Sequence, residues 1–466
     1  MGKYVIEVLD AVHCRANKHA RQVIKRCLSY KEVAWKRARF GREQKIEKHH
    51  LITGREGTSG LFLTGLLPRI KAYCKKRKIR LTITTEEQEG REIIRRPKVK
   101  DITFRPDQEA ALGAVRRHHR GKIVFPTGTG KTIIALGIIS MFPNYRILIL
   151  CHTKDLVQQL KDELGAHGYN KIQIVGAGYK VKNIKRLFQK DSVIVIGTIQ
   201  SFSKIDVKHY RAFFDLTIVD EVHHVNSRSS QYGKVMTNNL SPRRYGLTAT
   251  EPTKAKEILI NEGFFGPTIA KLTEAEGIEK GIIAEPIVNL ISVPYDMKIN
   301  QKCKYRYGLL YDYGIVKNRA RSQMTVAEAI KTANKGQTVL IVIERTEHGK
   351  KLKTMLKYKG IRAPFIHGGT DMAIRNKTKK KLNDKKVKIV ICSKVWKEGI
   401  NIPTLNHIIN AVGMKEEKQV RQAIGRGFRT AEGKTTIKLT DFLDPYRYLA
   451  EHSILRIQIY AKEGWL

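Results

Sequence analysis

The stretch that constrains the fold most is FPTGTGKT, residues 125–132. A short apolar run, residues 121–125, precedes it, and residues 132–142 continue with the apolar spacing of a buried helix. This order predicts a strand, a loop and a helix. Gly128 and Gly130 allow the loop to turn its N–H groups toward phosphates at the N-terminal end of the helix. The stretch predicts a phosphate-binding loop, and the alternative is a glycine-rich turn before a core helix.

The loop predicts contacts with a nucleotide polyphosphate. We expect Lys131 to reach the β and γ phosphates and Thr132 to place its hydroxyl on the Mg²⁺ that bridges them. Position 125 is Phe where the full pattern has Gly, so the strict motif fails at one residue. The predicted cofactors are ATP and Mg²⁺, and the other expected loop contacts are Pro126, Thr127, Gly128, Thr129 and Gly130.

Composition indicates a globular protein with a polyanionic partner. The length of 466 residues is typical of about two to four domains, and we expect three. Hydrophobic residues make up 41% of the chain, enough for several cores. Lys and Arg number 88 against 43 Asp and Glu, a formal charge of +45. This excess predicts nucleic acid as the partner, and the alternative is a solvated basic surface without a specific partner.

The cysteines and the apolar runs indicate the compartment. No two cysteines stand at metal-ligand spacing, so we expect reduced, structural thiols. No apolar run approaches the roughly 18 residues that span a bilayer, and the N-terminus lacks the apolar core of a signal peptide. We therefore expect a cytoplasmic protein without a membrane partner. The six cysteines are Cys14, Cys27, Cys74, Cys151, Cys303 and Cys392.

Residues 1–100 predict a small basic α+β domain that binds nucleic acid. They hold 26 Lys and Arg against 10 Asp and Glu, a net charge of +16. Residues 20–40 have helical periodicity, and residues 69–86 read as a helix end that runs into a strand. A basic cluster at that turn suits phosphate contacts, and the alternative is a solubilising face. The cluster comprises Lys75, Lys76, Arg77 and Lys78.

Two successive α/β domains are predicted after this region, over residues 101–286 and 287–466. Residues 95–106 read as a linker, because two prolines and a charge run interrupt the periodicity. Short β-branched strands then alternate with amphipathic helices, a pattern typical of a parallel sheet covered on both faces. The predicted fold class is α/β, with two tandem parallel-sheet domains after the N-terminal domain.

An acidic pair, Asp220 and Glu221, directly follows the apolar strand LTIV. In a parallel sheet its carboxylates emerge at the C-terminal edge, beside the phosphate loop. We expect Asp220 to hold Mg²⁺ and Glu221 to orient and deprotonate the attacking water. The alternative is an acidic start of a helix.

From about residue 104 to residue 430 the chain resembles helicase superfamily 2, in particular its DExH branch. The resemblance implies that both α/β domains are RecA-like. It assigns adenine recognition to FRPDQ, with Phe104, Arg105 and Gln108. It assigns phosphate-backbone contacts to ILILCHTKDLVQQ and IGTIQSF, namely to Thr153, Thr198 and Gln200.

The resemblance continues through the second domain. Thr248 and Thr250, with His223, are implied to link hydrolysis to domain movement. The segments FIHGG and CSKVWKEGINIP are implied to contact nucleic acid through His367, Gly368 and Ser393, and nucleotide through Gly399 and Asn401. Ser393 stands where the family usually has Thr, and Asn401 where Asp is frequent; both side chains still form hydrogen bonds.

QAIGRGFR is the most specific downstream match, with Gln422, Arg426 and Arg429 at the family's spacing. The resemblance implies an arginine finger that stabilises charge on the γ-phosphoryl group, an effect worth about 10³ to 10⁵ in rate in comparable systems. It also implies a hydrogen bond from His223 toward Gln422.

The order of segments is similar to branch-migration helicases of the UvsW type and to their RecG-like relatives. This resemblance implies an ATP-driven DNA helicase or translocase that acts on forks and junctions, in phage DNA repair, recombination or replication. A monomer is compatible with it. One alternative is an RNA helicase of the same superfamily. Another is a non-unwinding ATP-gated clamp or the motor subunit of a restriction system.

Overall fold

The computed structural model describes residues 3–38, 41–51, 60–85, 94–176, 178, 188, 193–303, 306–393, 402–413 and 434–466, with only the backbone of residues 33–38 and 41–45. Two compact units are present. Residues 1–125 and 131–271 form the first unit, and residues 126–130 and 272–466 form the second. None of the helices in the described ranges is both long and apolar enough to cross a membrane.

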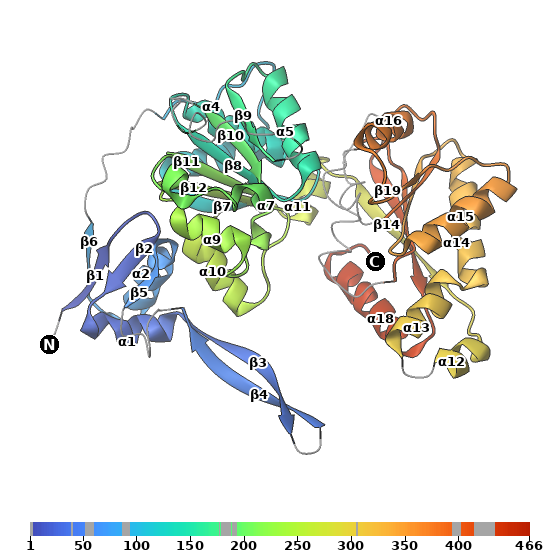
Figure 1. The fold of residues 1–466 in the computed structure, drawn as a ribbon, viewed down its shortest axis with the longest axis horizontal. Helices are drawn as coiled ribbons and strands as arrows, with labels where there is room; N and C mark the ends of the chain where they lie inside the picture. Colours follow the sequence, from blue (N-terminus) through green and yellow to red (C-terminus); the bar gives the residue numbers. More distant parts are fainter. Residues whose placement is uncertain are drawn as a thin grey trace. The chain divides into compact units, whose positions relative to one another are not determined.

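The N-terminal region forms a four-stranded mixed sheet in the order β5-β2-β1-β6, next to two helices (Figure 1). Strand β1 pairs antiparallel with β2 and parallel with β6. The predicted helix-to-strand turn is present, because α2 ends at Lys76 and β6 begins at Leu81. The elements are β1 (Tyr4–Val8), β2 (His13–Ala16), α1 (Lys18–Cys27), β5 (Leu61–Leu63), η2 (Thr64–Leu66), α2 (Leu67–Lys76) and β6 (Leu81–Thr85).

The helix predicted over residues 20–40 is wrong in its second half. Helix α1 ends at Cys27, and β3 (Ser29–Ala38) pairs antiparallel with β4 (Gly41–His50) in a long hairpin. The pairing runs without a break from Ser29 opposite His50 to Ala38 opposite Gly41. Cross-strand hydrogen bonds engage the backbone of alternate residues along the segment, and this pairing outweighs a helical pattern of weak propensity.

The N-terminal region packs on α10 (Ala255–Phe265) of the first unit. Arg69 donates from Nε and Nη2 to the Glu262 carboxylate at 2.5 and 2.9 Å. A Cβ added at Gly65 would lie 2.2 Å from the Glu262 carbonyl oxygen, and one at Gly263 would lie 2.5 Å from Leu63 Cδ1. The two backbones therefore approach as closely as glycine allows, and one apolar core runs through both parts.

The first parallel sheet has seven strands in the order β13-β7-β12-β11-β8-β10-β9. Its central strands are buried on both faces, as parallel strands covered by helices are. The strands are β7 (Arg120–Val124), β8 (Ile147–Cys151), β9 (Ile172–Val175), β10 (Ile194–Thr198), β11 (Leu216–Asp220), β12 (Arg243–Thr248) and β13 (Thr268–Lys271). Besides α10, the helices are α3 (Pro106–Arg117), α4 (Lys131–Met141), α5 (Lys154–Ala166), α7 (Ile199–Phe202), α8 (Val207–Tyr210), η3 (Val222–His224) and α9 (Gln231–Asn238).

The second parallel sheet has six strands in the order β14-β19-β18-β15-β17-β16. The strands are β14 (Glu285–Ser292), β15 (Val339–Val342), β16 (Phe365–Ile366), β17 (Ile389–Cys392), β18 (His407–Asn410) and β19 (Thr436–Leu443). The helices are α11 (Glu274–Glu279), α12 (Met297–Cys303), α13 (Tyr307–Tyr311), the π-helix η4 (Asp312–Val316), α14 (Arg319–Ala333), α15 (Thr346–Tyr358), α16 (Met372–Asn383) and α18 (Arg447–Lys462).

The predicted fold class is confirmed: two parallel-sheet domains follow a small basic α+β domain. The predicted division after residue 286 falls inside β14, and the domain boundaries stay predictions.

Candidate active site

The phosphate loop joins β7 to α4, as the sequence predicts. Gly128 and Gly130 adopt φ angles of 90° and 86°, values that L side chains rarely adopt. Thr129 is fully buried, and its hydroxyl donates to the Pro126 carbonyl oxygen at 2.7 Å. The loop therefore has a defined turn, and its two glycines are there for a conformational reason.

Lys131 begins α4, and its side chain folds back on the loop. Its Nζ donates to the Phe125 carbonyl oxygen at 3.1 Å. The Phe125 N–H in turn donates to the Thr248 carbonyl oxygen at 3.0 Å. These two hydrogen bonds connect the Lys131 ammonium group to the ends of β7 and β12.

The acidic pair lies at the C-terminal end of β11, next to β12 and β8 in the sheet. Burial raises the pKa of the Asp220 carboxyl to about 7, and the charge of Glu221 adds to the rise. Burial also opposes ionisation of Glu221, but contact with His223 and the charge of Lys131 outweigh it and lower the Glu221 pKa to about 2. Two adjacent half-buried carboxylates repel each other, so one stays ionised more readily than the other.

The Glu221 backbone is strained. Its φ and ψ angles of 52° and 53° are left-handed, a region that costs a non-glycine residue about 1 kcal/mol or more. The carboxylate oxygen Oε2 is buried, makes an ion-pair contact of 3.3 Å with His223 Nδ1, and has no hydrogen bond of acceptable geometry among the described residues. Strain and an unsatisfied buried oxygen together are typical of a functional carboxylate.

A chain of polar contacts connects the acidic pair with the end of β12. The Thr248 hydroxyl donates to the Thr250 carbonyl oxygen at 2.8 Å, and His223 Nδ1 lies 2.9 Å from the same hydroxyl. Which of the two groups donates in the His223–Thr248 contact depends on the tautomer of the imidazole ring. The structure thus brings together the three residues predicted to couple hydrolysis to movement.

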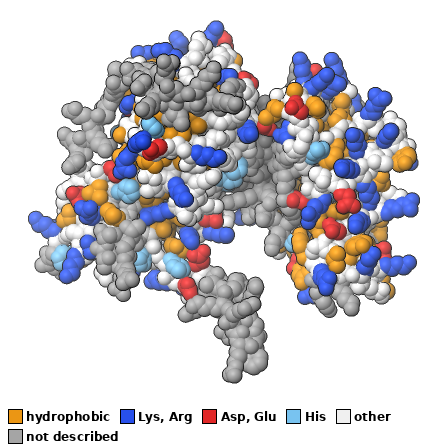
Figure 2. Space-filling view, in the orientation of Figure 1, with side chains coloured by type: hydrophobic (Ala, Val, Ile, Leu, Met, Phe, Trp, Pro, Cys, Tyr) orange, Lys and Arg blue, Asp and Glu red, His pale blue; other side chains and the backbone are white. Residues whose placement is uncertain are grey.

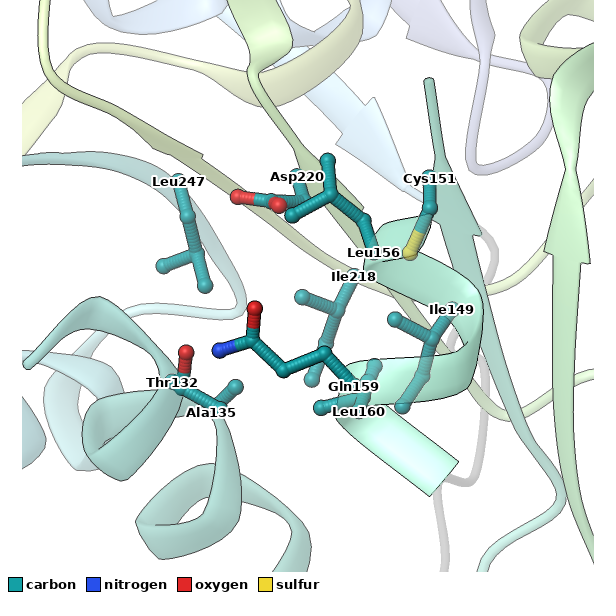
Figure 3. Close-up of a pocket in the computed structure, with 10 residues that line it drawn as sticks. All are labelled: Thr132, Ala135, Ile149, Cys151, Leu156, Gln159, Leu160, Ile218, Asp220 and Leu247. Carbon is teal, nitrogen blue, oxygen red and sulfur yellow. The ribbon is translucent and has the colours of Figure 1, made fainter. Parts of the chain in front are cut away.

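Thr132 and Asp220 line one small cavity with Gln159 of α5 (Figure 3). In the close-up the Gln159 amide lies between the Thr132 hydroxyl and the Asp220 carboxylate. The cavity measures about 40 Å³, room for an ion or a few waters but far below the roughly 300 Å³ of a small-molecule pocket. Gln159 was not predicted from the sequence, because only its position on the inner face of α5 brings it here.

The residues present fit Mg²⁺. Their ligand atoms are hard oxygens, and Glu221 Oε2 is a buried oxygen with no hydrogen bond to any residue that the structure describes. No group of three His, Cys, Asp or Glu side chains that could hold a metal alone occurs within the described ranges. Mg²⁺ does not require such a group, because one or two carboxylates commonly bind it together with waters and substrate phosphates.

The segment predicted to recognise adenine precedes α3. A Cβ added at Gly137 would lie 3.1 Å from Phe104 Cε1, so the Phe104 ring packs on α4. Arg105 pairs with Asp107, and the buried Gln108 accepts a hydrogen bond from the Arg105 N–H at 3.1 Å. These contacts hold the start of α3 in place, and adenine recognition by these residues stays a prediction.

Two of the three predicted backbone contacts in the first unit lie near the edge of the sheet. Thr153 caps α5 and accepts from the Leu156 N–H at 3.3 Å, and the exposed Gln200 donates to the His152 carbonyl oxygen at 3.4 Å. Thr198 is buried instead, and its hydroxyl donates to Ser201 Oγ at 3.0 Å.

Two histidines connect these segments with the acidic pair. His152 precedes Thr153, and its ring stacks on that of His224 with centroids 4.0 Å apart and an angle of 9° between the planes. His224 lies 4.3 Å from His223 by ring centroids. The sequence offered only a weak signal for this stack, a second histidine after the acidic motif, and gave His224 no role.

In the second unit the structure brings His367, Gly368 and Ser393 together. Strands β16 and β17 are paired neighbours, and the Ser393 N–H donates to the Ile366 carbonyl oxygen at 2.9 Å. Arg375 donates to the Gly368 carbonyl oxygen at 2.9 Å and so holds this loop. The three residues form one strip along the C-terminal edge.

The predicted basic turn is exposed. Lys75, Lys76, Arg77 and Lys78 all face solvent at the end of α2. The Arg77 guanidinium stacks over the Tyr73 ring at 3.9 Å. The predictions for Gly399, Asn401, Gln422, Arg426 and Arg429 lie outside the described residues.

Two family profiles match the chain: "Type III restriction enzyme, res subunit" over residues 101–253 and "Helicase conserved C-terminal domain" over residues 322–431. The chain is similar to the ATP-dependent DNA helicase uvsW of Enterobacteria phage T4, at 27% identity over 364 residues that cover 72% of this chain and 71% of that protein. The chain belongs to helicase superfamily 2. The predicted resemblance and enzyme class, a nucleic-acid-dependent ATPase of the DNA helicase type, are confirmed.

A second relative and a solved structure extend the similarity. The DNA 3'-5' translocase XPB2 of Sulfurisphaera tokodaii is 25% identical over 374 residues, which cover 72% of this chain and 80% of that protein. The ATP-dependent Type ISP restriction-modification enzyme LlaBIII bound to DNA has a TM-score of 0.58 at 16% identity, covering 84% of this chain and 32% of that one. This structural likeness shows the tandem RecA-like fold.

Proposed function

We propose that this superfamily 2 chain is an ATP-driven motor of the DExH type that acts on forked and branched DNA. One observation carries the ATPase part: Lys131, Thr132, Asp220 and Glu221 meet at the C-terminal edge of the first sheet, with Glu221 strained and its Oε2 unsatisfied. A phosphate loop after β7 and an acidic pair after β11, on the two sides of β12, provide what phosphoryl transfer to water requires.

The residues have distinct proposed tasks. Lys131 exchanges its contact with the Phe125 carbonyl oxygen for the β and γ phosphates of ATP. Thr132 and Asp220 hold Mg²⁺, which when bound neutralises charge on the β and γ phosphates. Glu221, which has the lower pKa of the pair, accepts a proton from the attacking water. The predicted finger residues Arg426 and Arg429, with Gln422, act on the γ-phosphoryl group.

His223 and Thr248 are proposed to connect hydrolysis with movement. His223 contacts both the base Glu221 and the Thr248 hydroxyl. Thr248 in turn holds the backbone of Thr250 at the end of β12. Loss of the γ phosphate changes the charge near Glu221. The contacts of His223 and Thr248 transmit this change to Thr250, which follows the end of β12.

The N-terminal region is proposed to contact the duplex arm of a fork or junction. Its exposed basic turn, Lys75–Lys78, suits phosphates. Arg69 and Glu262 attach this region to α10, and the basic turn belongs to the same compact unit as Lys131, Asp220 and Glu221. The relative from phage T4 supports DNA as the substrate, and roles in repair, recombination or replication within the cytoplasm of a phage host are part of the proposal.

The test is the rate of ATP hydrolysis measured with single-stranded DNA, duplex, fork, four-way junction and RNA at matched nucleotide concentration. We expect the largest stimulation by the fork and the junction, together with unwinding of the branched substrates. Equal stimulation by every DNA contradicts branch specificity. Stimulation by RNA alone identifies an RNA helicase, and stimulation without strand separation identifies a non-unwinding translocase or clamp.

A further inference from the structure

Tyr307 is an exposed aromatic residue held by other rings. It begins α13, and 44% of its surface is exposed. Its ring centroid lies 5.6 Å from that of His452 and 6.2 Å from those of Tyr311 and Tyr448. Neighbouring rings thus support part of the ring while the rest remains open to solvent. The proposed function does not use this residue.

Helix α13 lies over the C-terminal edge of the second sheet. The Tyr311 hydroxyl donates to the Val412 carbonyl oxygen at 2.7 Å, just beyond the end of β18. Arg345, which follows β15, has its guanidinium 6.0 Å from the centre of the Tyr311 ring. Burial, and then the nearby Glu344 carboxylate, raise the pKa of the Tyr307 phenol, so the ring is neutral at physiological pH.

The same edge carries the predicted nucleic-acid contacts of this unit. His367 and Gly368 follow β16, and Ser393 follows β17. The sheet order β18-β15-β17-β16 puts Tyr311, which contacts Val412 after β18, at one end of this row and His367 at the other, and the Tyr307 ring lies beside Tyr311. A strand that runs along the row therefore reaches Tyr307.

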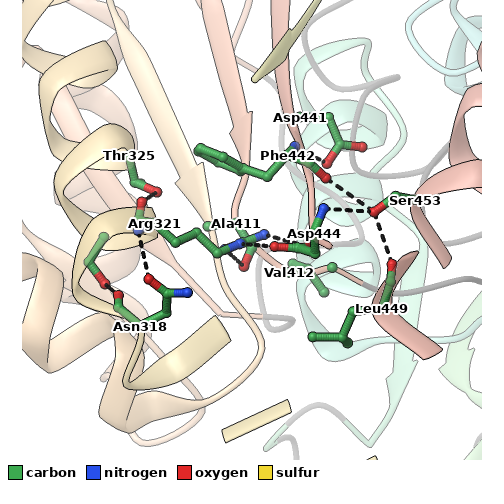
Figure 4. A network of polar contacts seen from close by, with 12 residues as sticks. Asn318, Arg321, Thr325, Ala411, Val412, Asp441, Phe442, Asp444, Leu449 and Ser453 are labelled. Atoms are coloured by element: carbon green, nitrogen blue, oxygen red, sulfur yellow. Dashed lines mark hydrogen bonds and ion pairs between the residues drawn. The ribbon is translucent and has the colours of Figure 1, made fainter. Parts of the chain in front are cut away.

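A buried polar network connects α14 and α18 to the second sheet (Figure 4). Arg321, fully buried, donates from Nε to Asp444 Oδ1 at 2.8 Å and from Nη1 to the Ala411 carbonyl oxygen at 3.0 Å. Arg456 of α18 donates from Nε to Asp441 Oδ2 at 2.8 Å. Buried charges that are paired and hydrogen-bonded hold their elements in one geometry. Tyr307 thus stands on helices that are tied to the ends of β18 and β19.

Several arginines lie around Tyr307, together with the acidic Glu344. Arg306, Arg345 and Arg447 are exposed, and the Arg447 guanidinium lies 5.2 Å from the centre of the Tyr448 ring. Lys302 lies 4.2 Å from the centre of the Tyr313 ring. Figure 2 shows hydrophobic side chains interspersed with Lys and Arg over the region of α12, α13 and α18. Aromatic rings among cations are typical of surfaces that bind single strands, where bases stack and phosphates pair.

We propose that Tyr307 is a stacking site for an unpaired base of the DNA strand that runs along the C-terminal edge of the second sheet, with Arg345 and Arg447 beside its phosphates. This inference rests on the proposed function, because it assigns a contact to the strand that the motor moves along. Stacking accepts any base, as a motor that moves over every sequence requires.

The test compares binding of the full-length chain to single-stranded DNA with binding to the same strand made abasic, by fluorescence anisotropy. Tyr307→Ala is expected to weaken binding of the intact strand about 5- to 150-fold, the range for one stacked base, and to leave binding of the abasic strand unchanged. Tyr307→Phe keeps the ring and is expected to bind like the wild type. Thermal unfolding of each variant checks that the fold is kept.

Tyr358→Ala is the matched control. Tyr358 is 86% exposed and ends α15, which starts at the same edge and runs about 18 Å away from it. This variant is expected to bind both strands like the wild type.

Equal losses on intact and abasic strands, or no loss, overturn the stacking site. A loss confined to RNA overturns the assignment to DNA. Absence of any DNA-stimulated ATP hydrolysis in the wild-type chain contradicts the proposed function itself. Stimulated hydrolysis with unchanged strand binding in Tyr307→Ala contradicts the stacking site alone.

Discussion

The charged side chains at the C-terminal edges of the two parallel sheets differ in how completely they are paired. In the first unit, Asp220 and Glu221 lie side by side and half-buried, and the buried Glu221 Oε2 has no hydrogen bond among the described residues. In the second unit, the buried Arg321 and Arg456 are paired with Asp444 and Asp441. The first edge keeps charge available for a ligand, whereas the second uses its charges to hold a surface rigid.

This difference follows from where stability and reactivity are needed. A buried carboxylate oxygen without a hydrogen bond costs free energy, and a protein keeps one where a cation or a proton will meet it. A paired buried charge positions neighbouring elements, although it adds little net stability compared with apolar packing. The first edge therefore fits chemistry, and the second fits a platform for a strand.

The largest effect is expected for Lys131→Ala, which tests the reactive edge. Removal of the ammonium group takes away the proposed phosphate partner but no surface contact, so ATP hydrolysis should fall more than about 100-fold while DNA affinity is kept. Steady-state ATP hydrolysis and DNA binding measure the two quantities. Lys122→Ala, a buried lysine on β7 outside the loop, is the control and should keep turnover in molecules that fold. Substantial turnover in Lys131→Ala refutes the loop assignment.

The two edges should respond in opposite ways to the same isosteric change. Asp444→Asn leaves Arg321 buried without its counter-charge and should lower the free energy of unfolding by about 3 kcal/mol. Asp220→Asn removes a carboxylate that burial disfavours, so stability should be unchanged or higher while ATP hydrolysis is lost. Chemical denaturation without nucleotide measures both. Similar destabilisation by the two variants means that the contrast between the edges is wrong.

Reversal of Lys75, Lys76, Arg77 and Lys78 to Glu should weaken fork binding about 10- to 100-fold and make its salt dependence shallower. Each phosphate that the variant no longer neutralises reduces the log–log salt slope by about 0.9. Titrations of fork DNA at several ionic strengths measure the slope. The control reverses Lys353, Lys357, Lys359 and Lys386, four exposed lysines with the same total charge change. An equal loss in both variants would show a non-specific effect of net charge.

The smallest effect is expected for Thr248→Val, which removes the hydroxyl that contacts both His223 and the backbone of Thr250. His223 then loses its partner at 2.9 Å, and the backbone of Thr250 loses its hydrogen bond. ATP hydrolysis should stay within about threefold, while unwinding per ATP hydrolysed falls about tenfold. Parallel measurement of hydrolysis and strand separation gives the ratio. An unchanged ratio removes the coupling role.

The sequence predicted the strands and the residues that directly follow them, because short stretches of neighbouring residues determine these features. The apolar runs at β8 and β11 gave the strands, and Asp220 and Glu221 follow directly from the end of β11. Contacts between distant residues could not be predicted in this way. Arg321 and Asp444 are 123 residues apart, and Arg69 and Glu262 are 193 apart.

The hairpin of β3 and β4 and the stack of two histidines were also not predicted from the sequence. Residues 29–38 carry a helical pattern but pair as β3 with β4, because cross-strand hydrogen bonds form only once the partner is present. The stack of His152 on His224 joins the ends of β8 and β11, which are neighbours in the sheet but far apart in the chain. The periodicity of a sequence shows which face of a helix or strand is buried, but not which other element packs against that face.

The most direct test of the central claim is a single-turnover measurement of ATP hydrolysis by Glu221→Gln with saturating fork DNA. The variant keeps Lys131, Thr132 and Asp220 but loses the proposed base, so it should bind ATP with near wild-type affinity and hydrolyse it at least about 100-fold more slowly than the wild type. Glu109→Gln, on the exposed side of α3, should hydrolyse ATP normally. Hydrolysis at the wild-type rate by Glu221→Gln would contradict the assignment of this edge as the catalytic centre.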